Sequence, residues 1–448
     1  MIGFDTIGNA TLIAYDDAPI IATDPWIRGG AYFGSWTFSH EIPREQLDSI
    51  ARCKYLWFSH GHPDHLSLES IHELSDKEIL LADHVGGRIA RDLTSLGLKT
   101  RVLPERKWVS LSPRVRVMTL SDYNQDSILL LDINGNLLIN INDANDRGWG
   151  LFVKSVARAF KRTYLLKLSH YGDADMINLF DENGGRVTPG AAKKAPVGQP
   201  LVRWARVFGA NHVVPFSSFH RYQREDSVWA NQYVVPLSAY ADGFDTNGAT
   251  LLPAFVRVDC QTAEVTELHP AENVACVKPV SDFGDNWSDR LEQDEKQKLI
   301  AYFQKKETLR SHVGFLRFLV GGEETTIDLN SKLRQFGITF EVPRCSLMTA
   351  VEYEVFDDLL IGNFMRTTLH GGAKLYPHFT PLVAKYSDNG GANTNRQLRT
   401  YFLEYFRRDP VNFLLNMLEV KSDDIFRKMI PKGSKPYKAA QALYWKIK

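Results

Sequence analysis

The chain has 448 residues, and its 53 basic and 53 acidic side chains cancel to a formal net charge of zero. A composition of 44% hydrophobic and 24% charged residues is that of a globular protein and excludes disorder as the main state. The charge balance argues against nucleic-acid binding, and no apolar run approaches the ~18 residues that would cross a membrane. Four cysteines without a CxxC pair, and no signal-peptide pattern, predict a reduced, cytoplasmic protein.

Short apolar runs that favour β-strands alternate with helical stretches over the first 260 residues. The strand candidates are residues 11–15, 19–23, 55–59, 115–120, 127–133, 137–141, 164–168 and 212–214. Between two of them, Asn134-Gly135 supplies the positive φ angles of a tight hairpin. Residues 152–160 and 201–208 have helical spacing, and each leads into a strand candidate. This order predicts an α/β fold with helices packed outside the sheets.

Two segments interrupt this pattern and suggest the domain organisation. Residues 182–200 are rich in Gly and Pro and form either a lid over a site or a surface insertion. Composition turns polar over residues 269–289, which predicts a linker between a catalytic domain (1–268) and a C-terminal region (290–448). The C-terminal region is expected to be α+β, and to serve as a substrate-binding cap, a homodimer surface or a docking face for a reductase.

The strongest chemical signal follows the strand candidate at residues 55–59. His60, His62, Asp64 and His65 lie within six residues, where a turn can aim them into one pocket. The alternation of His60 and His62 places both imidazoles on one side of the chain. Imidazole binds Zn, Fe and Mn alike, whereas carboxylate favours the harder ions. These residues therefore predict a metal site.

This spacing matches the HxHxDH signature, and the chain resembles the metallo-β-lactamase superfamily. The resemblance implies an αββα sandwich with one or two metal ions at the rim of its two sheets. It also implies an early strand-end aspartate at Asp24, a bridging aspartate at Asp143 and a late histidine at His220. Asp64 is one of two candidates for a catalytic role.

One position departs from the superfamily pattern. The histidine usually found before the hairpin is missing, and Asp122 is the expected substitute, with Asn124 and Asp126 behind it. The implied ligands of one ion are His60, His62, Asp122 and Asp143, and those of the other are Asp64, His65, His220 and Asp143. This oxygen-rich set favours iron over manganese or zinc.

A narrower resemblance covers most of the chain and concerns the CMP-N-acetylneuraminate hydroxylase family. It is carried by residues 8–11, 24–26, 35–41, 62–67, 248–251 and 357–364. Those hydroxylases have an N-terminal Rieske domain, whereas this sequence has no CxH…CxxH pattern. The resemblance therefore implies either a separate ferredoxin or reductase as electron source, or redox-neutral chemistry.

Further residues near the expected site keep more than one interpretation. His170, the second catalytic candidate, is a metal ligand, a general acid/base, a substrate contact or a structural histidine. Trp26, Tyr32, Phe33 and Trp36 either wall a pocket or pack beneath the sandwich.

The leading functional hypothesis is a two-iron oxygenase that uses O2 on a small metabolite. The alternatives are a metal-dependent hydrolase that uses metal-bound hydroxide and a binding protein without catalysis.

Overall fold

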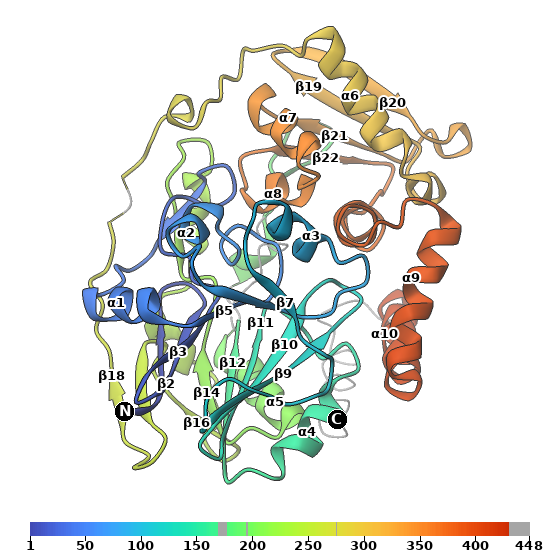
Figure 1. Ribbon diagram of the computed structural model, residues 1–448. Helices are drawn as coiled ribbons and strands as arrows, with labels where there is room; N and C mark the ends of the chain where they lie inside the picture. Colours follow the sequence, from blue (N-terminus) through green and yellow to red (C-terminus); the bar gives the residue numbers. More distant parts are fainter. Residues whose placement is uncertain (169–176, 194–195, 275, 430–448) are drawn as a thin grey trace.

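The computed structural model describes residues 1–168, 177–193, 196–274 and 276–429. Two β-sheets pack face to face with helices on their outer sides, and a third sheet with its own helices lies above them in Figure 1. This is the αββα architecture of the metallo-β-lactamase fold followed by a smaller α+β region. It confirms the fold that the sequence predicts.

The first sheet contains eight strands, of which β3, β5, β6 and β7 run parallel to one another. In sheet order they are β18 (Val265–Glu267), β17 (Val256–Asp259), β1 (Ile2–Ile7), β2 (Thr11–Asp16), β3 (Ala18–Thr23), β5 (Tyr55–Phe58), β6 (Glu78–Leu81) and β7 (Thr100–Val102). The parallel strands are joined through α1 (Arg44–Arg52), α2 (Leu68–Glu73) and α3 (Arg88–Ser95). Because β3 and β5 are parallel neighbours, their carboxyl ends meet at one edge of the sheet.

The second sheet contains seven strands, and it includes the predicted hairpin. In sheet order they are β16 (Thr250–Leu251), β14 (His212–Pro215), β12 (Arg162–Lys167), β11 (Asn136–Asn142), β10 (Ser127–Ile133), β9 (Val115–Ser121) and β8 (Val109–Ser110). Asn134 and Gly135 have φ angles of 50° and 79°, and they join β10 to β11 as expected. The helices α4 (Gly150–Ala157) and α5 (Gly198–Phe208) connect the parallel strands β11, β12 and β14.

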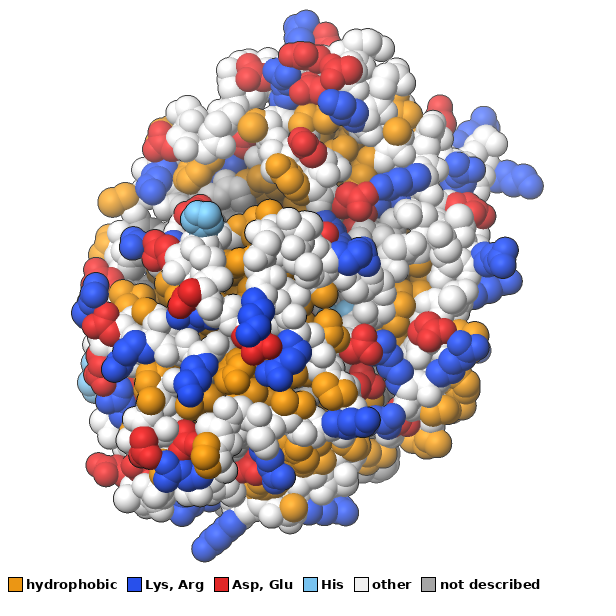
Figure 2. Space-filling model, in the orientation of Figure 1, with side chains coloured by type: hydrophobic (Ala, Val, Ile, Leu, Met, Phe, Trp, Pro, Cys, Tyr) orange, Lys and Arg blue, Asp and Glu red, His pale blue; other side chains and the backbone are white. Residues whose placement is uncertain are grey.

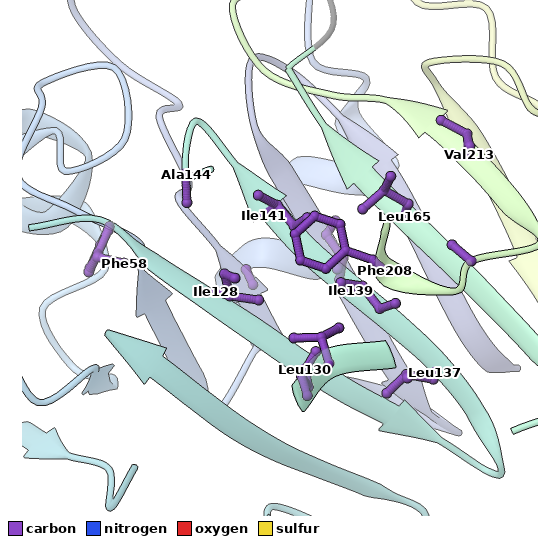
Figure 3. Packing of buried hydrophobic residues seen from close by; sticks show 14 of the residues in the cluster. Phe58, Ile128, Leu130, Leu137, Ile139, Ile141, Ala144, Leu165, Phe208 and Val213 are labelled. Atoms are coloured by element: carbon purple, nitrogen blue, oxygen red, sulfur yellow. The ribbon is translucent and has the colours of Figure 1, made fainter. Parts of the chain in front are cut away.

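The strands of the sandwich are apolar on both faces because both faces are covered. In β10, Leu129 and Leu131 belong to the core between the two sheets. Their neighbours Ile128 and Leu130 point to the opposite face, where Phe208 of α5 covers the second sheet (Figure 3). The continuous apolar runs of the sequence thus reflect a buried layer rather than an exposed face.

The third sheet organises the C-terminal region and has a separate core. Its order is β13 (Leu179–Phe180), β22 (Arg366–His370), β21 (Gly337–Glu341), β19 (Phe315–Val320) and β20 (Glu323–Asp328). The helices of the region are α6 (Gln293–Gln304), α7 (Arg344–Glu352), α8 (Phe356–Ile361), the π-helix η8 (Pro381–Asn389), α9 (Asn395–Arg408) and α10 (Pro410–Met429). Phe303, Phe318, Phe340 and Phe356 lie at the centre of this core. Since β13 lies before residue 268, the N-terminal part of the chain contributes a strand to this sheet.

Short elements complete the described chain. The two-stranded sheet consists of β4 (Trp36–Phe38) and β15 (His220–Tyr222), and 3₁₀ turns occur at Gly190–Lys193, Val228–Tyr233, Leu237–Ala241, Val280–Phe283, Glu307–Ser311 and Ser331–Leu333. Over the face in Figure 2, basic and acidic side chains intermix without a patch of one sign. No described helix combines the length and the apolar character that a membrane crossing requires. The domain boundaries at residues 269–289 stay a prediction.

Candidate metal centre

The HxHxDH motif occupies the turn between β5 and α2. The backbone N–H groups of His65 and Leu66 both donate to the carbonyl of His62, at 3.0 and 2.7 Å. This turn folds His65 back onto His60, so that their ring centroids are 4.3 Å apart. The rings of His60 and His62 are 4.5 Å apart. One short segment therefore brings three imidazoles together.

Asp143 joins this cluster from the end of β11 in the second sheet. Its Oδ2 lies 3.4 Å from Nε2 of His65 and 3.9 Å from Nε2 of His60. Oδ2 of Asp64 lies 3.2 Å from the same nitrogen of His65. Among the described residues, His60, His65 and Asp143 form one group whose donor atoms all lie within 4.8 Å of one another. Donors about 2.1 Å from one ion are roughly 3.0–3.5 Å apart, so the spacing suits a transition metal.

The electrostatics around His65 favour a positive charge at its Nε2. The ring is fully buried, and Nε2 has no hydrogen-bond partner within the described part of the chain, although two carboxylates face it. Burial alone would lower the pKa of His65, but Asp64 and Asp143 raise it well above its usual value. Burial would raise the pKa of Asp143, yet His65 holds it well below its usual range. A metal ion that takes the place of the proton satisfies the same attraction.

Asp24 and Ser59 fix the orientation of two imidazoles. Asp24 accepts hydrogen bonds from the Ser59 hydroxyl at 2.7 Å and the Asn142 side chain at 2.6 Å, and it lies 3.2 Å from Nδ1 of His65. Because the Ser59 hydroxyl donates its hydrogen to Asp24, it accepts from Nδ1 of His60, 2.9 Å away. In both histidines a partner on Nδ1 leaves Nε2 to face the centre of the cluster, and such a partner on the second nitrogen is usual for metal-binding histidines.

Tyr32 connects the aromatic loop after Asp24 to the cluster. Its hydroxyl donates to Oδ1 of Asp64 at 2.5 Å, while the Asn9 side chain donates to Oδ2 at 2.9 Å. Burial would raise the pKa of Asp64, but His65 and the hydrogen bond from Tyr32 lower it. Tyr32 thus lines the site, whereas Trp26 packs against Phe38 at a ring-centroid distance of 4.3 Å. A catalytic role for Asp64 stays a prediction.

Two residues of the C-terminal region reach the cluster, and sequence reasoning missed both. Oδ2 of Asp357, in α8, lies 3.2 Å from Nε2 of His62, and Nζ of Lys385, in η8, lies 3.4 Å from the same nitrogen. Asp358, the neighbour of Asp357, falls with Asp357 and His62 in a second group of potential metal-binding atoms. Asp357 and Asp358 lie in residues 357–364, one of the segments that carry the hydroxylase resemblance, and this resemblance could have pointed to them. No sequence pattern points to Lys385.

The structure does not bring Asp122 into either group of donor atoms. Its Oδ1 accepts hydrogen bonds from the backbone N–H groups of Asn124, at 2.7 Å, and Asp126, at 3.3 Å. Asp122 thereby closes the loop between β9 and β10, as aspartates in short turns often do. Burial, and next the charge of Asp126, raise the pKa of Asp122 to about 7.

Replacing Asp122 with asparagine should change how stability depends on pH. Since the folded pKa of about 7 exceeds the ordinary value of 3.8, the folded state binds the additional proton and loses stability as pH rises between about 4 and 7. Asp122→Asn keeps the oxygen that closes the loop and removes this titration. Urea unfolding of metal-free protein should show a flatter profile and a gain at pH 8 on the order of 1–4 kcal/mol. An unchanged profile would contradict the placement of this carboxyl.

The structure describes the surroundings of His220 but not those of His170. His220 lies in β15, and its ring stacks on Trp36 with centroids 3.3 Å apart and planes 2° apart. It belongs to neither group of donor atoms within the described residues. His170 lies outside the described residues, so its predicted role is untested.

The fold and the cluster together define a protein of the metallo-β-lactamase fold with a candidate metal centre. No family model matches the chain. It is similar to the cytidine monophosphate-N-acetylneuraminic acid hydroxylases of Asterias rubens, at 28% identity over 140 residues, and Xenopus laevis, at 29% over 143 residues. The matches cover 29% and 30% of this chain but 21% and 24% of those proteins. The chain therefore matches about a quarter of the length of these curated relatives.

Solved structures give more distant likenesses. Igni18, a metallo hydrolase from Ignicoccus hospitalis, has a TM-score of 0.35 and 13% identity, over 59% of this chain and 98% of that chain. CmlA, a diiron β-hydroxylase from Streptomyces venezuelae, has a TM-score of 0.37 and 13% identity, over 59% of this chain and 54% of that chain. Likenesses at this level say nothing of activity.

Proposed function

We propose that the chain is a metal-dependent enzyme, and specifically an iron oxygenase that hydroxylates a small polar metabolite. The observation that carries the proposal is the group His60, His65 and Asp143. Two imidazoles and one carboxylate are the donor set of non-haem iron oxygenases, which leave other positions of the ion open. The partial similarity to hydroxylases supports the same class of reaction.

Bound iron would supply the redox chemistry with O2. Insertion of one oxygen atom into a C–H bond requires two electrons and two protons that convert the other oxygen atom to water. A separate ferredoxin or reductase is the proposed electron source. The residues of the chain would bind and orient: Asp24 and Ser59 fix two imidazoles, and Tyr32 fixes the Asp64 carboxylate. A second ion requires further donors, for which Asp122 and His220 are the sequence candidates.

Metal analysis and reoxidation test this proposal together. Protein produced with iron in the medium and purified without chelator should contain one to two irons per chain. Dithionite should bleach its visible absorption, and O2 should restore it. Tightly bound zinc, with no response to dithionite or O2, would overturn the oxygenase proposal.

A metal-dependent hydrolase is the second candidate function. It is favoured by the three imidazoles of His60, His62 and His65, because nitrogen-rich sites suit zinc, which lowers the pKa of bound water toward ~7. Zinc-loaded protein should then cleave chromogenic esters, lactones or phosphodiesters. The same assay on iron-loaded protein serves as its comparison.

A further inference from the structure

We propose that Asp357 and Lys385, both in the C-terminal region, are positioning residues that hold His62 in the orientation required for metal binding. This inference rests on the metal centre proposed above. It assigns the C-terminal region a direct part in that centre, in addition to any role in binding substrate or partner.

The ring of His62 has a different neighbour on each nitrogen. Nδ1 lies 2.8 Å from Nε2 of His60, and Nε2 lies 3.2 Å from Oδ2 of Asp357. A neutral imidazole carries one hydrogen, so an Nε2–H that donates to Asp357 leaves a lone pair on Nδ1. Nε2 of His60 also presents a lone pair, because its Nδ1 donates to Ser59. Two lone pairs 2.8 Å apart repel unless a proton or a metal ion lies between them. A bound ion would widen this separation to the roughly 3.0–3.5 Å of two ligands of one ion.

Lys385 places a positive charge beside the pair formed by His62 and Asp357. Its Nζ lies 3.4 Å from Nε2 of His62 and 3.8 Å from Oδ2 of Asp357, so it competes with Asp357 for the same nitrogen. The carboxylate is the closer of the two neighbours of Nε2. The hydrogen on Nε2 is therefore assigned to Asp357, while Lys385 balances the carboxylate.

The buried carboxyl of Asp357 faces two groups that can donate to it or balance its charge, Nε2 of His62 at 3.2 Å and Nζ of Lys385 at 3.8 Å. A charged acceptor orients an imidazole more strongly than a neutral one. Lys385 comes from a π-helical segment, and such segments frequently occur at functional sites.

The competing interpretation is a second cation held by His62, Asp357 and Asp358, whose donor atoms also lie within 4.8 Å of one another. The ammonium of Lys385 argues against it, because this positive charge already contacts His62 and Asp357. Asp358 separates the two interpretations. It is as buried as Asp357 and lies on the same helix, yet no hydrogen bond joins it to His62 in the described part of the chain.

The experiment measures the affinity of the metal-free full-length chain for Co²⁺, through the visible absorption of the bound ion. Asp357→Asn should weaken binding about 10–100-fold, the usual effect of removing a partner that orients a metal-binding histidine. Lys385→Met should weaken binding less, because it acts through Asp357. Asp358→Asn is the matched control and should stay within about threefold of the unmodified chain. Melting of the metal-free variants should remain close to that of the unmodified protein, which separates positioning from a general loss of structure.

The outcomes are distinct for the inference and for the metal centre itself. Failure of the unmodified chain to bind Co²⁺ would overturn the metal centre. Tight binding that Asp357→Asn leaves within threefold would overturn only the positioning role. Equal losses in Asp357→Asn and Asp358→Asn, with one ion fewer per chain, would favour the second cation. If Asp357→Asn does not fold, Lys385→Met decides, and an affinity within twofold of the unmodified chain would overturn the inference.

Discussion

Replacing Asp143 with alanine is expected to remove metal binding and every activity that depends on it. Asp143 is the carboxylate that His60 and His65 share, at 3.9 and 3.4 Å. Loss of a partner that merely orients a ligand weakens metal affinity about 10–100-fold, so loss of a ligand should cost more than about 100-fold. Co²⁺ titration of the metal-free protein, followed by metal analysis after dialysis, measures the effect.

Asp132→Ala provides the control for this prediction. Asp132 is also an aspartate of the β10–β11 hairpin, but it pairs with Arg116 of the neighbouring strand β9, at 2.8 Å, and accepts from the backbone N–H of Gly135 in the turn, at 2.8 Å. Such partly exposed ion pairs contribute little to stability. The control should therefore bind Co²⁺ as the unmodified chain does. Should Asp143→Ala retain affinity within threefold, the ion would have to lie elsewhere.

The parts of the site that lie in one short segment could be predicted from the sequence. His60, His62, Asp64 and His65 follow a strand directly, so the local turn alone decides that they converge. The nearly continuous apolar runs of β10 and β11 likewise indicate strands whose two faces are both covered. Local patterns succeed here because the interactions that fix the geometry are themselves local.

Other features of the site depend on contacts between residues far apart in the chain, which the spacing of residues in the sequence does not indicate. Asp357 and Lys385 reach His62 across sequence separations of 295 and 323 residues, and no motif connects them. Asp122 was expected as a ligand because of its place before the hairpin, but the backbone of its own loop provides nearer partners. The stacking of His220 on Trp36 depends on the pairing of β15 with β4, which the sequence pattern did not reveal.

The second large effect concerns the attachment of the C-terminal region rather than the metal. Arg224→Met is expected to lower the free energy of unfolding by about 3–5 kcal/mol, because it leaves a buried carboxylate unpaired. Arg224 and Asp285 are both fully buried and 2.9 Å apart. Asp285 also accepts from the backbone of Ser346 in α7 at 2.9 Å, and the guanidinium lies 4.0 Å from the centre of the Phe364 ring, just after α8. The ion pair thus connects the sandwich to the helices beside His62.

Arg221→Met is the matched control because it lies three residues away and pairs with Glu272 at the surface, at 2.5 Å. Exposed pairs contribute less than about 1 kcal/mol, so urea midpoints should separate the two variants clearly.

Adding Asp285→Leu to Arg224→Met should recover part of the loss, since an apolar side chain leaves no buried charge without a partner. No recovery would assign the loss to Asp226, whose carboxylate accepts from the same guanidinium at 3.0 Å. A loss under 1 kcal/mol in the single variant would show that Asp285 finds another cation or water, and that the junction does not depend on this pair.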